Sequence, residues 1–194
     1  MAQALTPAAA LLALSLLLQA LNYGVMGGWL ALYSFRKLGA TAPASLAVLF
    51  SFWLALTAGR VAATRLPAVL SRIRALAGVS ATSVLGCLFL LNTSQPAGAL
   101  VGAMLVGAGL GALHPLTMSA AARRSTQRPA AFVPGFFVTT FLGGVLLAGL
   151  LGPIAGRFGV DVIVWTSLAG SVAAMLVLSI IAIESKLSEA AAAR

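Results

Sequence analysis

Charged side chains are scarce in this sequence. Only 8% of its 194 residues are Asp, Glu, Lys or Arg, whereas 61% are hydrophobic. A soluble globular domain carries about 25% charged residues. So few charges cannot cover a water-exposed surface. They suit a lipid-exposed surface, because placing a charged side chain at mid-bilayer costs about 2.5 kcal/mol or more. The composition therefore predicts an integral membrane protein, with the lipid bilayer as its first partner.

Side chains that build metal centres and acid–base pairs are also few. The sequence has one His, one Cys and three acidic residues, and none of the acids lies in the interior of a predicted helix. A single cysteine excludes an intrachain disulfide, and a dense His/Cys metal site cannot be built. Paired-acid catalysis and proton coupling through an embedded carboxylate are both excluded for this chain alone. We expect no enzyme activity, no metal and no cofactor.

The net charge of +9 does not indicate a nucleic-acid partner, because the basic residues lie in the gaps between apolar runs rather than in one patch. The first 35 residues carry no charge, so the basic region of a cleavable signal peptide is missing and we expect a retained helix. The start at Met1 and the polar tail favour a complete reading frame.

Long uncharged runs predict six transmembrane helices. A crossing needs about 20 residues, and the uncharged run 75–122 is long enough for two crossings, with a polar turn at Asn92-Thr93-Ser94-Gln95-Pro96 between them. The runs are continuous rather than alternating, which excludes β-barrel strands. We predict an all-α membrane protein, a single bundle over residues 1–194, with helices at residues 8–34, 44–65, 73–92, 97–122, 130–156 and 160–183.

The distribution of basic residues predicts the orientation. With six crossings, one side of the membrane holds both termini and two loops, and it carries Arg60, Arg65, Arg72, Arg74, Arg123, Arg124, Arg128, Lys186 and Arg194. The other side carries Arg36, Lys37 and Arg157. Cytoplasmic loops are enriched in Lys and Arg. The chain is therefore predicted to lie in a bacterial inner membrane with both termini in the cytoplasm.

A short match relates the two halves of the chain. Ala58-Gly59-Arg60 ends the second predicted helix and Ala155-Gly156-Arg157 ends the fifth. Each closes the middle helix of a three-helix group, and an odd number of crossings per group places the two motifs on opposite sides. This predicts an inverted 3+3 repeat of the kind found within transporter halves.

Several segments, in order, resemble one family. They are Asn22-Tyr23-Gly24, Gly27-Gly28-Trp29-Leu30, Phe52-Trp53, Gly59-Arg60, the glycine-rich segment 107–115, Gly143-Gly144 and the segment 152–156. Over about residues 10–185 the chain resembles the C-terminal six-helix bundle of a major facilitator superfamily transporter, nearest the fucose-permease and sugar-transporter branch. It departs from that family in lacking the N-terminal bundle and in lacking an acidic residue in the loop after the second helix.

One face of the first helix carries a stripe of residues spaced by three and four, namely Ser15, Gln19, Asn22, Met26, Trp29 and Tyr33. The family resemblance implies that this helix lines the solute path, so Gln19, Asn22, Met26, Trp29 and Tyr33 are candidate solute-binding residues. The alternative is hydrogen bonding between helices, with Trp29 and Tyr33 as interfacial anchors. We expect that the chain does not cover this face by itself.

His114 is the titratable side chain deepest within a predicted helix, and an ionisable residue there suggests function. It is a candidate solute-binding residue, and the alternative is a neutral histidine bonded to a neighbouring helix. Arg60 and Arg157 are candidates for gating or loop pairing. The pairs Gly98/Gly102, Gly107/Gly111 and Gly152/Gly156 predict close helix contacts, while Pro115 and Pro153 predict bends.

These features predict a half-sized transporter for a small solute. A full-length family member places the path between two six-helix bundles, so this chain would act as a homodimer or with a separate N-terminal half. The alternative is a non-transporting membrane subunit or assembly factor that keeps the fold.

Overall fold

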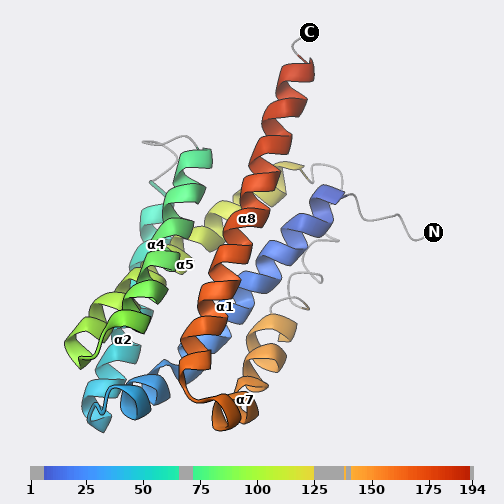
Figure 1. The fold of residues 1–194 in the computed structure, drawn as a ribbon. Coiled ribbons are helices and arrows are strands. Elements are labelled where there is room, and N and C mark those ends of the chain that lie inside the picture. The colour runs from blue at the N-terminus through green and yellow to red at the C-terminus, as the bar shows by residue number, and fades with distance from the viewer. Residues whose placement is uncertain (1–6, 66–71, 125–137, 139–140, 193–194) are drawn as a thin grey trace.

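The computed structural model describes residues 7–65, 72–124, 138 and 141–192, and these residues form helices without a strand. Figure 1 shows their arrangement. In chain order the elements are α1 (Pro7–Lys37), α2 (Ala42–Ala63), α4 (Arg72–Asn92), α5 (Pro96–Arg124), the π-helix η1 (Leu142–Leu147), α7 (Leu151–Phe158) and α8 (Asp161–Ala192).

Five of these helices are long and apolar enough to cross a membrane, namely α1, α2, α4, α5 and α8. Five of the six predicted helices are thus confirmed, with α8 running further than predicted. Most of the first half of the predicted helix 130–156 lies outside the described residues. Its described part is interrupted, because η1 is followed by a turn before α7 begins.

The two predicted proline bends have different outcomes. α5 runs from Pro96 to Arg124 without interruption, although Pro115 lies inside it. Pro153 lies in the first turn of α7, directly after the turn that separates α7 from η1. Proline is tolerated there, because the first N–H groups of a helix have no partner within it. The break in this segment therefore precedes Pro153.

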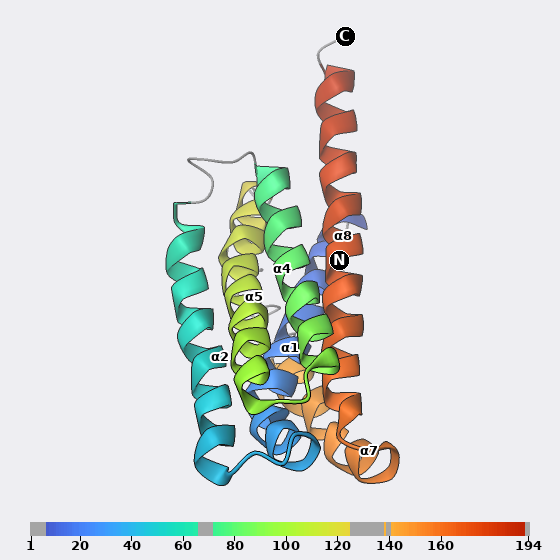
Figure 2. The same cartoon turned by 60° about the vertical axis from the view of Figure 1, so that its left-hand side comes forward.

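The described helices alternate in direction, so α1 begins and α2, α5 and α8 end at the same end of the bundle (Figures 1 and 2). We call this the terminal end. Among the connections at the opposite end, the one between α1 and α2 and the one between α7 and α8 each contain a glycine with positive φ, Gly39 at +60° and Gly159 at +89°. Lys37 and Asp161 form an ion pair of 2.7 Å there, which joins the last residue of α1 to the first of α8.

Close helix contacts hold the bundle together. α2 and α4 both pack on α5, while α1 packs on α8 and η1, and α4 also packs on α8. Gly107 and Gly111 of α5 lie directly against the backbone of α2 at Phe52 and Leu56, where an added Cβ would collide with a carbonyl oxygen. The predicted close contact at Gly107/Gly111 is confirmed. Gly156 has open space around it, so the Gly152/Gly156 pair does not form such a contact.

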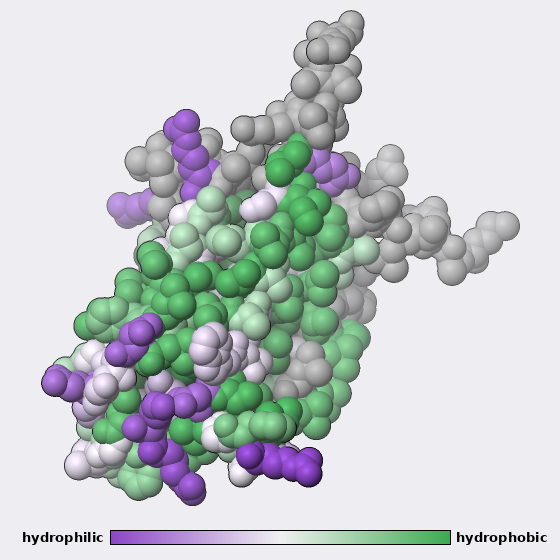
Figure 3. All heavy atoms as spheres, viewed as in Figure 1, coloured by the Kyte–Doolittle hydropathy of each residue, from purple (hydrophilic) through white to green (hydrophobic). Residues whose placement is uncertain are grey.

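The surface of the bundle is apolar between its two ends. Large hydrophobic side chains such as Phe50, Leu54 and Leu85 are more than half exposed. Figure 3 shows one face, on which hydrophobic residues cover the middle and hydrophilic residues gather toward both ends. This is the surface that a lipid bilayer requires of a spanning protein.

Candidate functional site

The stripe on α1 is covered by the chain's own helices. Gln19, Asn22, Met26 and Tyr33 are all fully buried. The expectation that this face stays uncovered within one chain is therefore wrong. The physical reason is that α8 and α5 both pack against α1 and supply the covering surface.

Hydrogen bonds account for part of this burial. Gln19 Nε2 donates to Ser15 Oγ and to Thr117 Oγ1 of α5, both at 3.0 Å. The Tyr33 hydroxyl donates to the Leu90 carbonyl of α4 at 2.8 Å. These bonds join α1 to two neighbouring helices. They agree with the alternative interpretation of the stripe, in which its polar side chains form hydrogen bonds between helices.

Trp29 faces a third neighbour of α1. Its Nε1 donates to the carbonyl of Ala148, just after η1, at 3.0 Å. Its ring also lies against Gly152 of α7, where an added Cβ would come within 3.0 Å of it. Trp29 therefore anchors the fifth helical segment to α1 and is only partly buried.

Asn22 differs from its neighbours in the stripe. Neither its Oδ1 nor its Nδ2 has a hydrogen-bond partner among the described residues. The side chain lies against Gly170 of α8, where an added Cβ would approach Nδ2 to 2.9 Å. An unmade hydrogen bond on a buried polar group costs about 1–3 kcal/mol. Asn22 is therefore held in the interior by packing rather than by hydrogen bonds.

A different side of α1 brings three polar side chains together from three helices. The Tyr23 hydroxyl donates to the Leu110 carbonyl of α5 at 2.7 Å. The Tyr23 ring meets His114 of α5 edge-on, with centroids 6.0 Å apart. The guanidinium carbon of Arg60 in α2 lies 5.8 Å from the centre of the same ring. Two predicted site residues, Arg60 and His114, thus converge on Tyr23.

The same surface continues along α2 toward Trp53. Trp53 lies over Gly27, close enough that an added Cβ would meet its ring at 2.6 Å. Trp53, Thr57 and Arg60 are spaced by four and three residues, so they share one face of α2, and all three are exposed. We call this surface the Arg60 face, and it comprises Tyr23, Gly27, Trp53, Thr57, Arg60 and His114.

Sequence reasoning missed Tyr23 as a site residue, although it stands next to Asn22. Adjacent residues on a helix are about 100° apart around its axis. Asn22 therefore faces α8 while Tyr23 faces α2 and α5. The spacing of Tyr23 and Gly27 was the available signal, since residues four apart share a face.

Arg157 lies far from this cluster. It is exposed near the end of α7, whereas Arg60 is near the terminal end of α2 (Figure 1). Gly59 packs on the backbone of Ala108, but Gly156 has open space around it. The two Ala-Gly-Arg motifs thus lie at opposite ends of the bundle in different surroundings.

A second buried polar cluster joins α4 to α8. Ser83 and Ser171 share a hydrogen bond of 3.0 Å, and Cys87 Sγ donates to Ser167 Oγ at 3.6 Å. All four residues are buried. The sequence analysis did not single out these serines, because a serine in an apolar run does not reveal which helix it faces. Their contacts are explained by helix packing.

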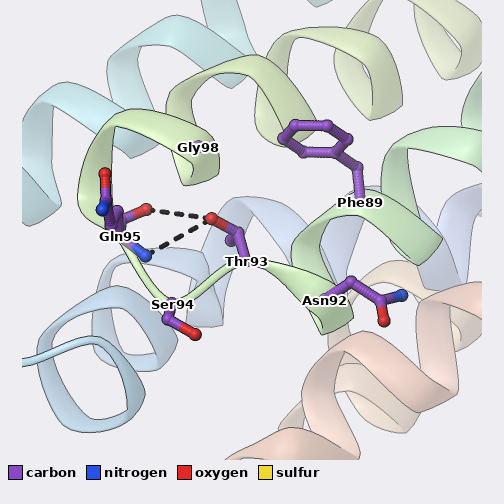
Figure 4. Close-up of a pocket in the computed structure, with 6 residues that line it drawn as sticks. All are labelled: Phe89, Asn92, Thr93, Ser94, Gln95 and Gly98. Carbon is purple, nitrogen blue, oxygen red and sulfur yellow. Dashed lines mark hydrogen bonds between the residues drawn. The ribbon is translucent and has the colours of Figure 1, made fainter.

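A hollow of about 320 Å³ lies at the turn between α4 and α5 (Figure 4). Thr93 organises this turn, since its hydroxyl donates to the Gln95 carbonyl at 3.2 Å and accepts from the Gln95 N–H at 3.4 Å. Phe89 and Asn92 complete the lining on the α4 side. The hollow is at the opposite end from Arg60, and its polar groups serve the turn.

Within the part of the chain that the structure describes, no three His, Cys, Asp or Glu side chains come together to hold a metal ion. No protein-family model and no curated protein matches this chain. Function is therefore inferred from the chain's own fold and side chains.

Proposed function

We propose that this chain is an integral membrane protein and a half-sized transporter for a small solute, which passes along the Arg60 face. The observation that carries the proposal is the position of Arg60, His114 and Tyr23. They converge from three helices on one partly exposed surface of a bundle that is apolar between its ends. Ionisable groups at such a position mark a solute path more often than a structural contact.

The pairing of helices supports an inverted 3+3 repeat. Exchanging α1 with α5, α2 with the fifth segment, and α4 with α8 maps the most extensive pairings onto one another, whereas the contacts of α1 with α2 and of α7 with α8 have no comparable counterpart among the described residues. The contact of α2 with α5 becomes that of η1 with α1, and the contact of α4 with α5 becomes that of α8 with α1. The contact of α4 with α8 maps onto itself, and Ser83 and Ser171, 88 residues apart, meet within it. Inverted repeats of this kind build transporter halves.

The proposed orientation has both termini in the cytoplasm of a bacterial inner membrane. Arg65, Arg74 and Arg124 are at the terminal end, whereas Arg36 and Lys37 are at the opposite end. Cysteines placed at Ser94 and Thr64, which are both exposed and at opposite ends, test this orientation. We expect a membrane-impermeant maleimide to label Ser94→Cys in intact cells and Thr64→Cys only after permeabilisation. Labelling of both in intact cells contradicts it.

One bundle provides only one wall of a solute path, so transport requires a second bundle to form the other wall. We propose a homodimer with two-fold symmetry, the commonest closed assembly, or pairing with a separate N-terminal half. The face that pairs is the Arg60 face, since the stripe on α1 is already covered.

A crosslink with a matched control tests this assembly. Thr57 on the Arg60 face and Thr82 on α4 each bond to the carbonyl four residues earlier, at 3.0 and 2.9 Å. Replacing either with cysteine therefore makes the same local change, and the native Cys87 is buried. We expect Thr57→Cys, but not Thr82→Cys, to give a disulfide-linked dimer in membranes. Equal crosslinking of both, or none, contradicts the homodimer.

A non-transporting subunit or assembly factor is the second candidate. It is favoured by the burial of Gln19, Asn22 and Tyr33, which the family resemblance had assigned to the path. The two candidates differ in flux. Uptake of a solute into proteoliposomes that contain the purified chain, lost in Arg60→Gln, supports transport. Co-purification of a constant protein partner without any flux supports the subunit.

A further inference from the structure

We propose that the Arg60 face binds a small organic anion, with its carboxylate at Arg60 and a ring or apolar body against Trp53. This inference rests on the proposed function and specifies the class of solute. It follows from the direction of the Arg60 side chain, from the absence of acids in the helices that pack on α2, and from the position of Trp53 on the same face.

Arg60 points toward the middle of the bundle. Gly111 of α5 lies against Leu56, one helical turn before Arg60, so Leu110 and Leu56 are at about the same depth. Tyr23 bonds to the Leu110 carbonyl, and its ring is the group that the Arg60 guanidinium contacts. The guanidinium therefore reaches inward from its own Cα rather than out to the nearer end.

The direction of α2 explains why Arg60 does not turn outward. Side chains on a helix lean toward its N-terminus, and the N-terminus of α2 is at the opposite end of the bundle. An arginine that snorkels to the headgroups needs to lean the other way. Arg60 thus presents its charge on the exposed face of α2, level with the apolar part of the bundle rather than beyond its end.

The chain supplies no counter-charge from the neighbouring helices. Residues 1–160 contain no Asp or Glu, so α1, α2, α4, α5, η1 and α7 have no carboxylate to offer. Of the three acids in the chain, Asp161 pairs with Lys37 at the opposite end, and Glu184 and Glu189 lie on α8, which is not one of the helices that pack on α2. The ring of Tyr23 offsets part of the charge by a cation–π contact. An anion from outside the chain is the natural complement, because a guanidinium binds carboxylate oxygens with two parallel hydrogen bonds.

The face of α2 beside Arg60 suggests the shape of the rest of the ligand. Trp53 precedes Arg60 by seven residues, which places it on the same face of α2 and about 10 Å away along the axis. Its indole is exposed and lies over Gly27, where the missing side chain leaves room for the ring. A small carboxylate with a planar or apolar body can therefore reach from Arg60 to Trp53.

Two pairs of probes separate the carboxylate from the body. Benzoate with benzamide, and glucuronate with glucose, differ mainly in the presence of the negative charge. We expect the full-length chain in phosphatidylcholine nanodiscs to bind radiolabelled benzoate, with cold benzoate or glucuronate competing and the neutral partners failing to compete. Arg60→Gln should weaken benzoate binding by about tenfold to a hundredfold, the loss expected for a charged hydrogen-bonded pair.

Arg60→Lys should restore part of the affinity, and Arg65→Gln, which removes a charge one turn further along the chain, should leave it unchanged. Equal competition by neutral and charged probes, or no benzoate binding, overturns the anion proposal. Native mass spectra can also show phosphatidylglycerol that stays bound to the chain and is lost in Arg60→Gln. If this is seen without benzoate binding, Arg60 binds a lipid headgroup, and the anion proposal is again overturned.

These outcomes are separable from the proposed function. If a neutral solute is transported and the neutral and charged probes compete equally, the transporter proposal stands and the anion proposal is wrong. Charge-selective binding without flux or a Thr57→Cys crosslink leaves the anion site in place and removes the transporter.

Discussion

Two sides of α1 show how differently one helix can place its polar residues. On the inner side, Gln19 and Asn22 are fully buried against α5 and α8. On the side toward α2, Tyr23 is partly buried and meets an exposed arginine and a histidine. The sequence suggests a site on the inner side, because its polar residues are more regularly spaced. Packing leaves an accessible surface only on the other side.

The two sides also differ in what they demand of neighbours. The inner side needs small residues such as Gly170 and hydroxyl partners such as Thr117. The side toward α2 needs room for Trp53 over Gly27. A polar residue in a membrane helix therefore has two possible purposes, and burial within the chain separates them.

The largest expected effect distinguishes packed from open positions along α1. An added Cβ at Gly24 would collide with the Gly144 carbonyl and with Ala148, whereas Gly28, one turn later, has open space. Gly24→Val should lower the free energy of unfolding by about 3 kcal/mol or more. Gly28→Val makes the same change in helix propensity, which favours Val slightly over Gly, and should lose no more than about 1 kcal/mol. Thermal unfolding in detergent measures both. Equal losses of stability in the two variants would contradict the close packing of Gly24 on η1.

Asn22 tests whether the inner side is structural. Replacing Asn22 with Leu, which has the same branched arrangement of heavy atoms, removes two polar atoms that have no partner among the described residues. We expect the variant to be more stable by about 1–2 kcal/mol. The same unfolding assay measures it, with solute binding as a second readout. A less stable variant that has also lost binding would return Asn22 to the solute path.

The two tyrosines provide a comparison of hydroxyl groups. Tyr33→Phe and Tyr23→Phe each remove one bond to a helix carbonyl, of 2.8 and 2.7 Å. Each should cost about 1 kcal/mol of stability. Only Tyr23→Phe should change benzoate affinity, because the lost hydroxyl bond holds in place the ring that Arg60 contacts. A change in affinity for Tyr33→Phe alone would reverse the assignment of the two sides.

The smallest expected effect is at the ion pair between α1 and α8. Lys37 and Asp161 are 43% and 41% exposed, so water and salt screen them. Lys37→Ala should lower stability by less than about 1 kcal/mol, and 1 M salt should erase the difference. Unfolding at two salt concentrations measures it. A loss comparable to that of Gly24→Val would show that the pair is shielded by a partner or by lipid.

Much of the fold could be predicted, because membrane helices follow from composition over about 20 residues. The bounds of five helices were predicted to within a few residues, except for the C-terminal end of α8. The interruption between η1 and α7 could not be predicted from Pro153, since the proline lies after the break. The direction of the α1 stripe was also missed, because periodicity shows which residues share a face but not which neighbour covers it.

The sequence by itself determined that the chain is helical, apolar along its spans and free of acids before Asp161. These properties depend on composition and local spacing alone. Only the tertiary structure decided that Gln19 and Asn22 turn inward while Arg60, His114 and Tyr23 converge from three helices. Such a convergence depends on how α1, α2 and α5 are rotated about their axes. That rotation is set by contacts between residues far apart in the chain, such as Gly111 on Leu56 and Tyr23 on Leu110.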